Sequence, residues 1–141
     1  MDRRPDDPHL PDADDPGHRE ALITSLGSPD PRERTAAVTT LSMSRDESVA
    51  KAAVLTGYQD GSRLVRRTAV DAAADLEDGE YRPMFEAAID DEDPWIRWRA
   101  VRAISDLGAG PSRETLMFAA VDDDSRVRSE AIAALNEADD G

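Results

Sequence analysis

The sequence contains no cysteine and only two histidines, His9 and His18, and these absences exclude several kinds of chemistry. Without cysteine there is no disulfide framework, no thiolate metal site and no cysteine nucleophile. Both histidines precede the first segment with clear helical patterning, which disfavours metal sites and general-base catalysis that depend on histidine. We therefore expect no resident metal ion and no catalytic centre built on either residue type.

Lysine is nearly absent as well, since Lys51 is the single lysine among 17 basic residues, whereas 31 residues are acidic. The formal net charge of −14 at pH 7 opposes non-specific binding to nucleic acid and to anionic membranes. An aspartate-rich, lysine-poor composition is typical of a salt-loaded cytoplasm, where the Debye length falls to roughly 3 Å near molar salt. A GC-rich genome also favours arginine over lysine, but it does not by itself explain so acidic a balance. We interpret the composition as halophilic.

Long apolar runs and catalytic motifs are also missing. No run approaches a membrane span, and the N-terminal residues lack the apolar stretch of a signal peptide, so we expect a cytoplasmic protein. Phosphate-binding glycine loops, G-x-S-x-G and H-E-x-x-H do not occur. The acidic runs 90–93 and 122–124 lack the glycine and glutamate that an EF-hand requires. The sequence therefore predicts a protein that is not an enzyme and holds no cofactor.

What the sequence does contain is an internal repeat with a period near 31 residues. The aligned segments are 28–41, 60–73, 91–104 and 122–135. Each holds an arginine, an alanine three positions later and then a β-branched apolar residue. These anchor arginines are Arg34, Arg66, Arg97 and Arg128. Because the apolar offsets of −1, +3, +4 and +7 follow one face of a helix, the repeat predicts four amphipathic helices in the same register.

A second, less regular apolar segment precedes each of these helices. The four preceding segments are 18–26, 47–58, 80–89 and 112–121. Turn residues separate the two members of each pair, and the expected N-caps of the second helices are Asp30, Ser62, Asp93 and Asp124. Pro31 and Pro94 stand at first helical positions, and Gly79 and Gly108 at expected helix ends. Because one pair is too small to bury its apolar face, we expect eight helices in four antiparallel pairs that stack, and no strand.

The expected organisation is a disordered acidic tail over residues 1–17 and a repeat domain over residues 18–138. The tail holds four of the nine prolines and six aspartates, and it has too few apolar residues to form a core. The expected repeats are 18–44, 46–77, 79–108 and 111–138.

The pattern D-x-D-x-x-V-R-x-x-A-V-x-A-L resembles the HEAT-repeat superfamily over roughly residues 18–138, specifically its short repeats named after phycobilisome lyases. The resemblance implies an all-α solenoid, a right-handed superhelix of about four two-helix repeats, with the second helices on a concave face. It also implies a structural ladder in which an aspartate six residues before the anchor pairs with arginines along the stack. The matching residues are Asp60 with Arg66, Asp91 with Arg97, and Asp122 with Arg128. Ser28 and Glu33 depart from the pattern, as suits a terminal capping repeat.

The candidate binding site is the segment 94–102, which contains both tryptophans and three arginines. Trp98 and Arg102 lie one and five positions after the anchor arginine, off the core face of the helix. Since tryptophan and arginine are enriched in binding hot spots, these surface positions and their neighbours form the expected partner-binding patch. Its members are Trp98, Arg102, Arg67, Asp71 and Trp95.

A structural interpretation of the same residues stays open. Trp95 and Trp98 would then cover the gap between repeats, with Arg99 or Arg102 stacked on an indole ring.

The sequence therefore predicts a non-catalytic module, an adaptor, scaffold or assembly factor, that binds another protein on the concave face. A second possibility, which rests on the name of the repeat type, is an accessory subunit or chaperone of a lyase-type or other prosthetic-group enzyme. Contact with nucleic acid through the arginines is a third, and the net charge disfavours it. We expect a monomer without membrane association.

Overall fold

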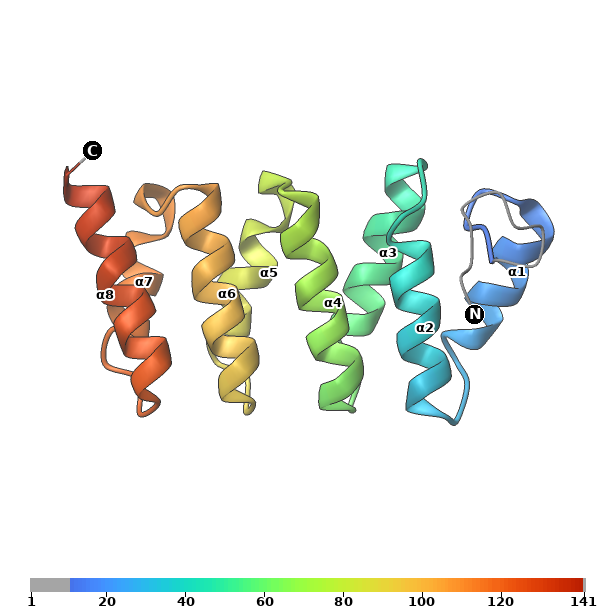
Figure 1. Ribbon diagram of the computed structural model, residues 1–141, viewed down its shortest axis with the longest axis horizontal. Helices are drawn as coiled ribbons and strands as arrows, with labels where there is room; N and C mark the ends of the chain where they lie inside the picture. Colours follow the sequence, from blue (N-terminus) through green and yellow to red (C-terminus); the bar gives the residue numbers. More distant parts are fainter. Residues whose placement is uncertain (1–10, 141) are drawn as a thin grey trace, which may run out of the picture. The chain divides into compact units, whose positions relative to one another are not determined.

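The structure is a computed structural model that describes residues 11–140, and these residues form helices and turns without a strand. Eight α-helices follow one another as four pairs in the described part of the chain (Figure 1), as the repeats predict. The chain divides into two compact units, residues 1–69 and residues 70–141. The boundary between the units falls within α4 (Arg63–Leu76).

The N-terminal unit contains α1 (Pro16–Ser25), α2 (Pro31–Leu41), α3 (Glu47–Tyr58) and the first half of α4. Helix α2 packs against both α1 and α3. The buried residues of this unit form two clusters: Ala13, Leu41 and Ala53, and Val38, Val65 and Ala69. Alanine at half of these positions lets the helices approach closely while the larger side chains fill the space around it.

Residues 11–17 differ from the expected disordered tail. Ala13 is buried against Leu41, and the carboxylate of Asp14 accepts a hydrogen bond of 2.7 Å from the hydroxyl of Ser44. Asp15 caps α1 by accepting from the N–H of His18. One buried alanine and these polar contacts order the segment, although its composition is too polar for a core of its own. The other residues of the expected tail lie outside the described part of the chain, and the expected domain boundaries stay a prediction.

The C-terminal unit contains the end of α4 and two further helix pairs, in which a short 3₁₀ turn precedes each first helix. These elements are η1 (Gly79–Tyr81), α5 (Arg82–Ala88), α6 (Pro94–Leu107), η2 (Gly110–Ser112), α7 (Arg113–Ala119) and α8 (Ser125–Asp140). Within this unit α6 lies beside α8, and α5 and α7 pack behind them (Figure 1). The largest fully buried side chains here include Phe85, Ile96, Val101, Ile104, Leu116 and Val127.

The helix starts follow the capping pattern of the sequence. The Asp30 carboxylate accepts from the N–H of Arg32 ahead of α2, and that of Asp93 accepts from the N–H of Trp95 ahead of α6. Pro31 and Pro94 open these two helices, as expected. Proline fits there because the first N–H of a helix has no intrahelical partner.

One of the two expected helix ends is wrong. Gly108 ends α6 with φ 106°, a conformation that favours glycine, as the sequence predicts. Helix α4, however, ends at Leu76, before the expected Gly79. The residue after it, Glu77, has a positive φ of 51°, which is uncommon for residues other than glycine. Gly79 instead begins η1, because the carboxylate of Asp78 caps that turn by accepting from the N–H of Glu80.

Candidate functional site

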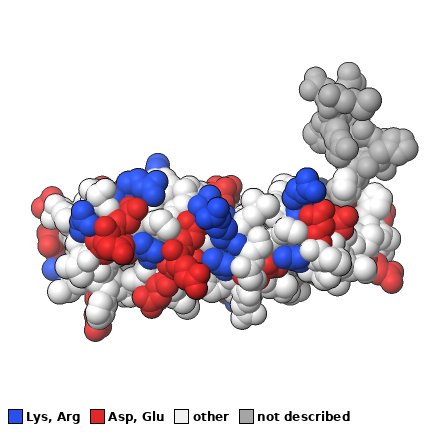
Figure 2. Space-filling model, turned by 90° about the horizontal axis from the view of Figure 1, so that it is seen from below, with Lys and Arg blue, Asp and Glu red and all other residues white. Residues whose placement is uncertain are grey.

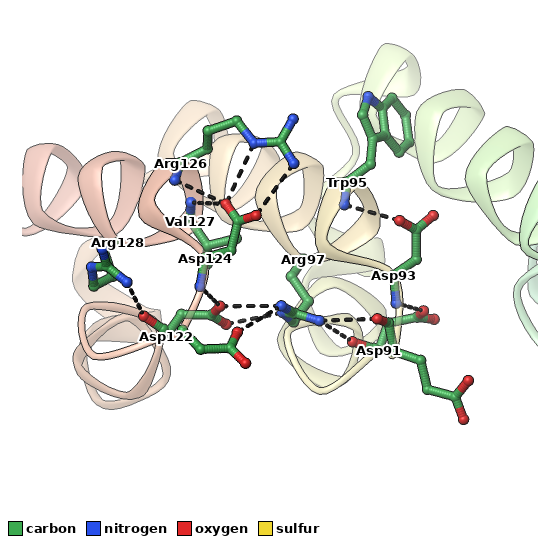
Figure 3. Close-up of polar contacts among 11 residues, drawn as sticks. Asp91, Asp93, Trp95, Arg97, Asp122, Asp124, Arg126, Val127 and Arg128 are labelled. Carbon is green, nitrogen blue, oxygen red and sulfur yellow. Dashed lines mark hydrogen bonds and ion pairs between the residues drawn. The ribbon is translucent and has the colours of Figure 1, made fainter.

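Two anchor arginines, Arg34 and Arg97, each pair with an aspartate of the next helix–helix turn. In the N-terminal unit, Arg34 donates from Nε and Nη2 to the two carboxylate oxygens of Asp60, at 2.8 and 3.1 Å. In the C-terminal unit, Arg97 donates in the same two-point geometry to Asp122, at 3.0 and 3.2 Å (Figure 3). These four side chains are between 11 and 19 % exposed. The aspartate thus pairs with the anchor of the preceding repeat, along the stack.

The same arginines also bind the turns that precede their own helices. Arg97 Nη1 donates to the carbonyl of Asp91 at 2.8 Å, and Arg128 Nη1 donates to the carbonyl of Asp122 at 2.8 Å (Figure 3). Arg66 Nη1 binds the carbonyl of Asp60 at 3.1 Å in the same way. The spacing of six residues therefore reflects a contact from the guanidinium to a backbone carbonyl, and the carboxylate is left for the preceding anchor.

Arg34 belongs to this arrangement although the expected ladder residues did not include it. Its Nη1 binds the carbonyl of Ser28 at 2.7 Å, so the loss of the aspartate from the first repeat does not remove the contact. The alignment of Arg34 with the other anchor arginines was the sequence feature that could have predicted this contact.

The ion pairs keep their carboxylates ionised. The hydrogen bond from Arg34 lowers the pKa of Asp60, against the opposing effect of burial. Burial raises the pKa of Asp122, but the N–H of Asp124 and the guanidinium of Arg97 together outweigh it, and the pKa is lowered. Each carboxylate also accepts a hydrogen bond from an N–H two residues further on, so both aspartates stabilise the turn in which they lie.

Trp95 and Trp98 lie on α6, and both are half-buried. Their ring centroids are 6.3 Å apart with the planes inclined by 55°. The guanidinium of Arg102 lies 5.6 Å from the centroid of the Trp98 ring. The predicted stacking of an arginine on an indole is therefore present, and the stacked pair lies at the surface because Arg102 is exposed.

Arg99 joins α6 to the end of α4. Its Nε donates to the carboxylate of Asp71 at 3.0 Å, and its Nη2 lies 3.8 Å from the carboxylate of Asp75. The sequence indicated Arg99 only as a possible stacking partner of an indole ring. Helical spacing does not predict its ion pair with Asp71, because the two residues are 28 positions apart.

Asp71 is therefore paired with Arg99, and its part in the partner-binding patch stays a prediction. Arg67 lies in the N-terminal unit, where it is half-buried. Its grouping with Trp98 stays a prediction.

An open hollow of about 330 Å³ lies beside Trp98, between α6 and the end of α4. Its lining residues are Ala74, Asp75, Glu77, Trp98, Arg99, Arg102 and Asp106. Hollows of this size hold small molecules or one or two side chains of a bound chain. The sequence did not indicate that Glu77 and Asp106 line this hollow, because the repeat pattern marks both only as exposed polar positions.

The described residues were also compared with the requirements of a metal site and of a membrane-spanning helix. Within residues 11–140, no three His, Asp or Glu side chains are grouped in a way that could hold a metal ion. His18 lies in α1, where its Nδ1 accepts from the N–H of Asp12 at 3.0 Å. No helix in this range is long and apolar enough to cross a membrane.

Acidic and basic side chains lie next to one another on the face that Figure 2 shows. Phosphate groups along a nucleic-acid backbone would meet carboxylates beside the arginines of this face, which opposes their binding.

Consecutive helix pairs with arginine–aspartate contacts between their turns define an α-helical repeat protein. The family model for HEAT repeats matches residues 52–136, more than half of the chain. The chain belongs to the HEAT-repeat family. A search of the curated proteins finds no match to it. HEAT repeats form extended surfaces that serve generally for binding other proteins.

Proposed function

We propose that the protein is a non-catalytic adaptor or scaffold that binds another protein through the surface of α6 centred on Trp98. The observation that carries this proposal is the half-buried Trp98, with Trp95 against it, Arg102 stacked on its ring and an open hollow beside it. Tryptophan and arginine at such positions contribute a large share of the binding energy in protein interfaces.

The helix that carries these residues is held firmly. Arg97 ties its first turn to two loops, and Arg99 ties its middle to α4. A surface that is already ordered loses little conformational entropy when a partner binds. This preorganisation supports an anchor site on α6 rather than on a loop.

A second exposed surface competes with this proposal. The exposed apolar residues at and just after the end of α7 are Met117, Phe118 and Val121, which are 57, 70 and 79 % exposed. This apolar surface does not line the hollow beside Trp98. It provides a matched control, because Phe118 is an exposed aromatic residue on a different helix.

The proposal is tested by capturing partners with the full-length protein in its native host, after cross-linking in the cell. Quantitative mass spectrometry compares the wild type with Trp98→Ala and Phe118→Ala. We expect at least one captured protein to fall by roughly ten-fold or more with Trp98→Ala and to stay at the wild-type level with Phe118→Ala. Equal capture by the wild type and Trp98→Ala contradicts the proposal.

Two finer assignments belong to the same proposal. The repeat period near 31 residues supports the short HEAT-like variety named after phycobilisome lyases. The acidic, lysine-poor composition supports a salt-rich cytoplasm as its setting. Circular dichroism against KCl concentration tests the setting: helicity that rises with salt supports it, and full helicity in dilute buffer contradicts it.

A further inference from the structure

The charges around the hollow beside Trp98 indicate what it can bind. Its lining holds two arginines, Arg99 and Arg102, and three carboxylates. Arg99 is already matched by Asp71 and by one of the lining carboxylates, Asp75. Arg102 lies over the Trp98 ring, which accepts its charge through the π face. Both cations therefore have charge partners, and Nη1 of Arg99, which has no hydrogen-bond partner among the described residues, is buried.

The other two carboxylates are open to a ligand. Glu77 and Asp106 are exposed, and their side chains form no hydrogen bond or ion pair with any of residues 11–140. Glu77 directly follows the last residue of α4 and has a positive φ, so the end of this helix sets its backbone position. Asp106 lies in the last turn of α6, near the negative end of the helix dipole, which adds to the negative potential there.

We infer that this hollow binds a basic segment of the partner protein, with an arginine or lysine of that segment paired to Glu77 and Asp106. The inference rests on the proposed function and gives the partner its chemistry. The aliphatic stem of the basic residue contacts the exposed part of the Trp98 ring, as long cationic side chains cover apolar surface elsewhere.

Three observations favour a basic segment over an acidic one. An acidic side chain would enter beside three lining carboxylates, and the guanidinium of Arg99 is already paired with Asp71 and Asp75. The net charge of −14 speeds the approach of a cation and slows that of an anion. The volume of about 330 Å³ accommodates side chains of an extended segment rather than the face of a folded domain.

The inference is tested with peptides, because both tryptophans lie at the site and their fluorescence reports binding directly. Random-sequence peptides on phage are selected on the full-length protein and counter-selected on the Trp98→Ala variant. We expect the surviving sequences to contain more Arg and Lys than Asp and Glu. We also expect their affinity to fall as salt is raised, because the paired charges are exposed.

A pair of double variants then tests the two carboxylates. One carries Glu77→Gln with Asp106→Asn, and the matched control carries Glu114→Gln with Asp90→Asn, which removes the same charge from exposed positions outside the hollow. Titration of the best selected peptide should show an affinity about five-fold lower or more for the first variant. The control should stay within about two-fold of the wild type.

Three results overturn the inference: selected peptides that are acidic or uncharged, equal losses in the two double variants, or no peptide whose binding depends on Trp98. None of these three results contradicts the proposed function, which the capture experiment tests separately. Capture that depends on Trp98 but is unchanged by Glu77→Gln with Asp106→Asn supports the proposed function and contradicts the basic segment. Capture that does not depend on Trp98 contradicts the proposed function itself.

Discussion

Arg97 on α6 and Asp122 in the turn before α8 form a two-point ion pair, with Nε and Nη2 at 3.0 and 3.2 Å from the carboxylate oxygens. The same guanidinium donates to the carbonyls of Asp91 and Glu92 in the turn before its own helix. One side chain thus connects two consecutive turns of the C-terminal unit. Planar, bidentate recognition of this kind is specific to arginine, since a lysine presents a single ammonium group.

Replacing this arginine should destabilise the protein. Arg97→Ala leaves the Asp122 carboxylate and two loop carbonyls without their donor, and we expect a loss of about 1–3 kcal/mol in the free energy of unfolding. Urea denaturation followed by circular dichroism measures it. Arg126→Ala is the control, because its ion pair with Asp124 involves a side chain that is 62 % exposed, and it should change stability little. An unchanged midpoint for Arg97→Ala would rule out a structural role for the ladder.

Stability should fall in acid through the paired aspartates. The pKa of Asp60 is lowered in the folded protein, chiefly by the hydrogen bond from Arg34. A lowered folded pKa gives a contribution that is fully present above the unfolded value of about 3.9 and is lost as the pH falls through the folded value. Asp60→Asn should therefore be less stable than the wild type at neutral pH, and the difference should shrink below about pH 4.

Thermal denaturation across this pH range measures the effect of Asp60→Asn. Glu20→Gln removes an exposed carboxylate from the same unit and serves as the control. A difference between Asp60→Asn and the wild type that is constant with pH would show that the ion pair contributes nothing through its charge.

Gly57 lies where α3 closely approaches α2 and α4. A Cβ at this position would lie 2.9 Å from Cγ2 of Val38 and 3.0 Å from Cβ of Ala69. Alanine is favoured over glycine in a helix by about 1 kcal/mol, but crowding of a packed core costs about 1–3 kcal/mol. We expect Gly57→Ala to lower the melting temperature. Gly61→Ala, which has no atom within 4 Å of the added carbon, should leave it unchanged or slightly raised.

Arg82 holds the end of α6. Its guanidinium donates to the carbonyls of Gly108 and Leu107 at 2.8 and 3.0 Å and to the hydroxyl of Ser112 at 2.9 Å. Arg82→Met keeps the apolar stem but removes these donors, and we expect a loss of about 1–2 kcal/mol in the free energy of unfolding. Arg113→Met, which loses an exposed ion pair with Asp139, should change the urea midpoint much less.

Trp98→Ala should separate binding from stability. The half-buried ring loses its contacts with Trp95 and Arg102, worth about 1 kcal/mol in total. Ile96→Ala on the same helix removes a side chain that is 0 % exposed and should cost about 2–5 kcal/mol. Thermal denaturation of the two variants compares them. A loss for Trp98→Ala as large as that for Ile96→Ala would place Trp98 in the core instead of on a binding surface.

The repeat made much of the local structure readable from the sequence. An aspartate just before α2 and α6 and a proline at the first position of each set their starts, because a carboxylate cap and a fixed φ act within one turn of the chain. The end of α4 was misread, because Glu77 takes a left-handed conformation that glycine usually adopts, and Gly79 is used in the next turn. The contact of Ala13 with the core was not predicted either, because a single buried alanine leaves almost no trace in the hydrophobic pattern.

The candidate site was readable only in part. The position of Trp98 and Arg102 off the core face followed from their offset to Arg97, and the stacking of the two side chains agrees with it. The pairing of Arg99 with Asp71 did not follow, because it joins two helices. Glu77 and Asp106 were not predicted for the same reason, since nothing along either helix relates them to a common hollow.

By itself the sequence determined the all-α repeat architecture, because helical periodicity, caps and anchor arginines act over a few residues and recur in every repeat. Only the tertiary structure decided which aspartates Arg34 and Arg97 bind, which carboxylates bind Arg99 and which side chains line the hollow beside Trp98. These contacts join residues about 25 or more positions apart. Their geometry depends on how neighbouring helices pack, and the sequence pattern of a single helix does not contain that information.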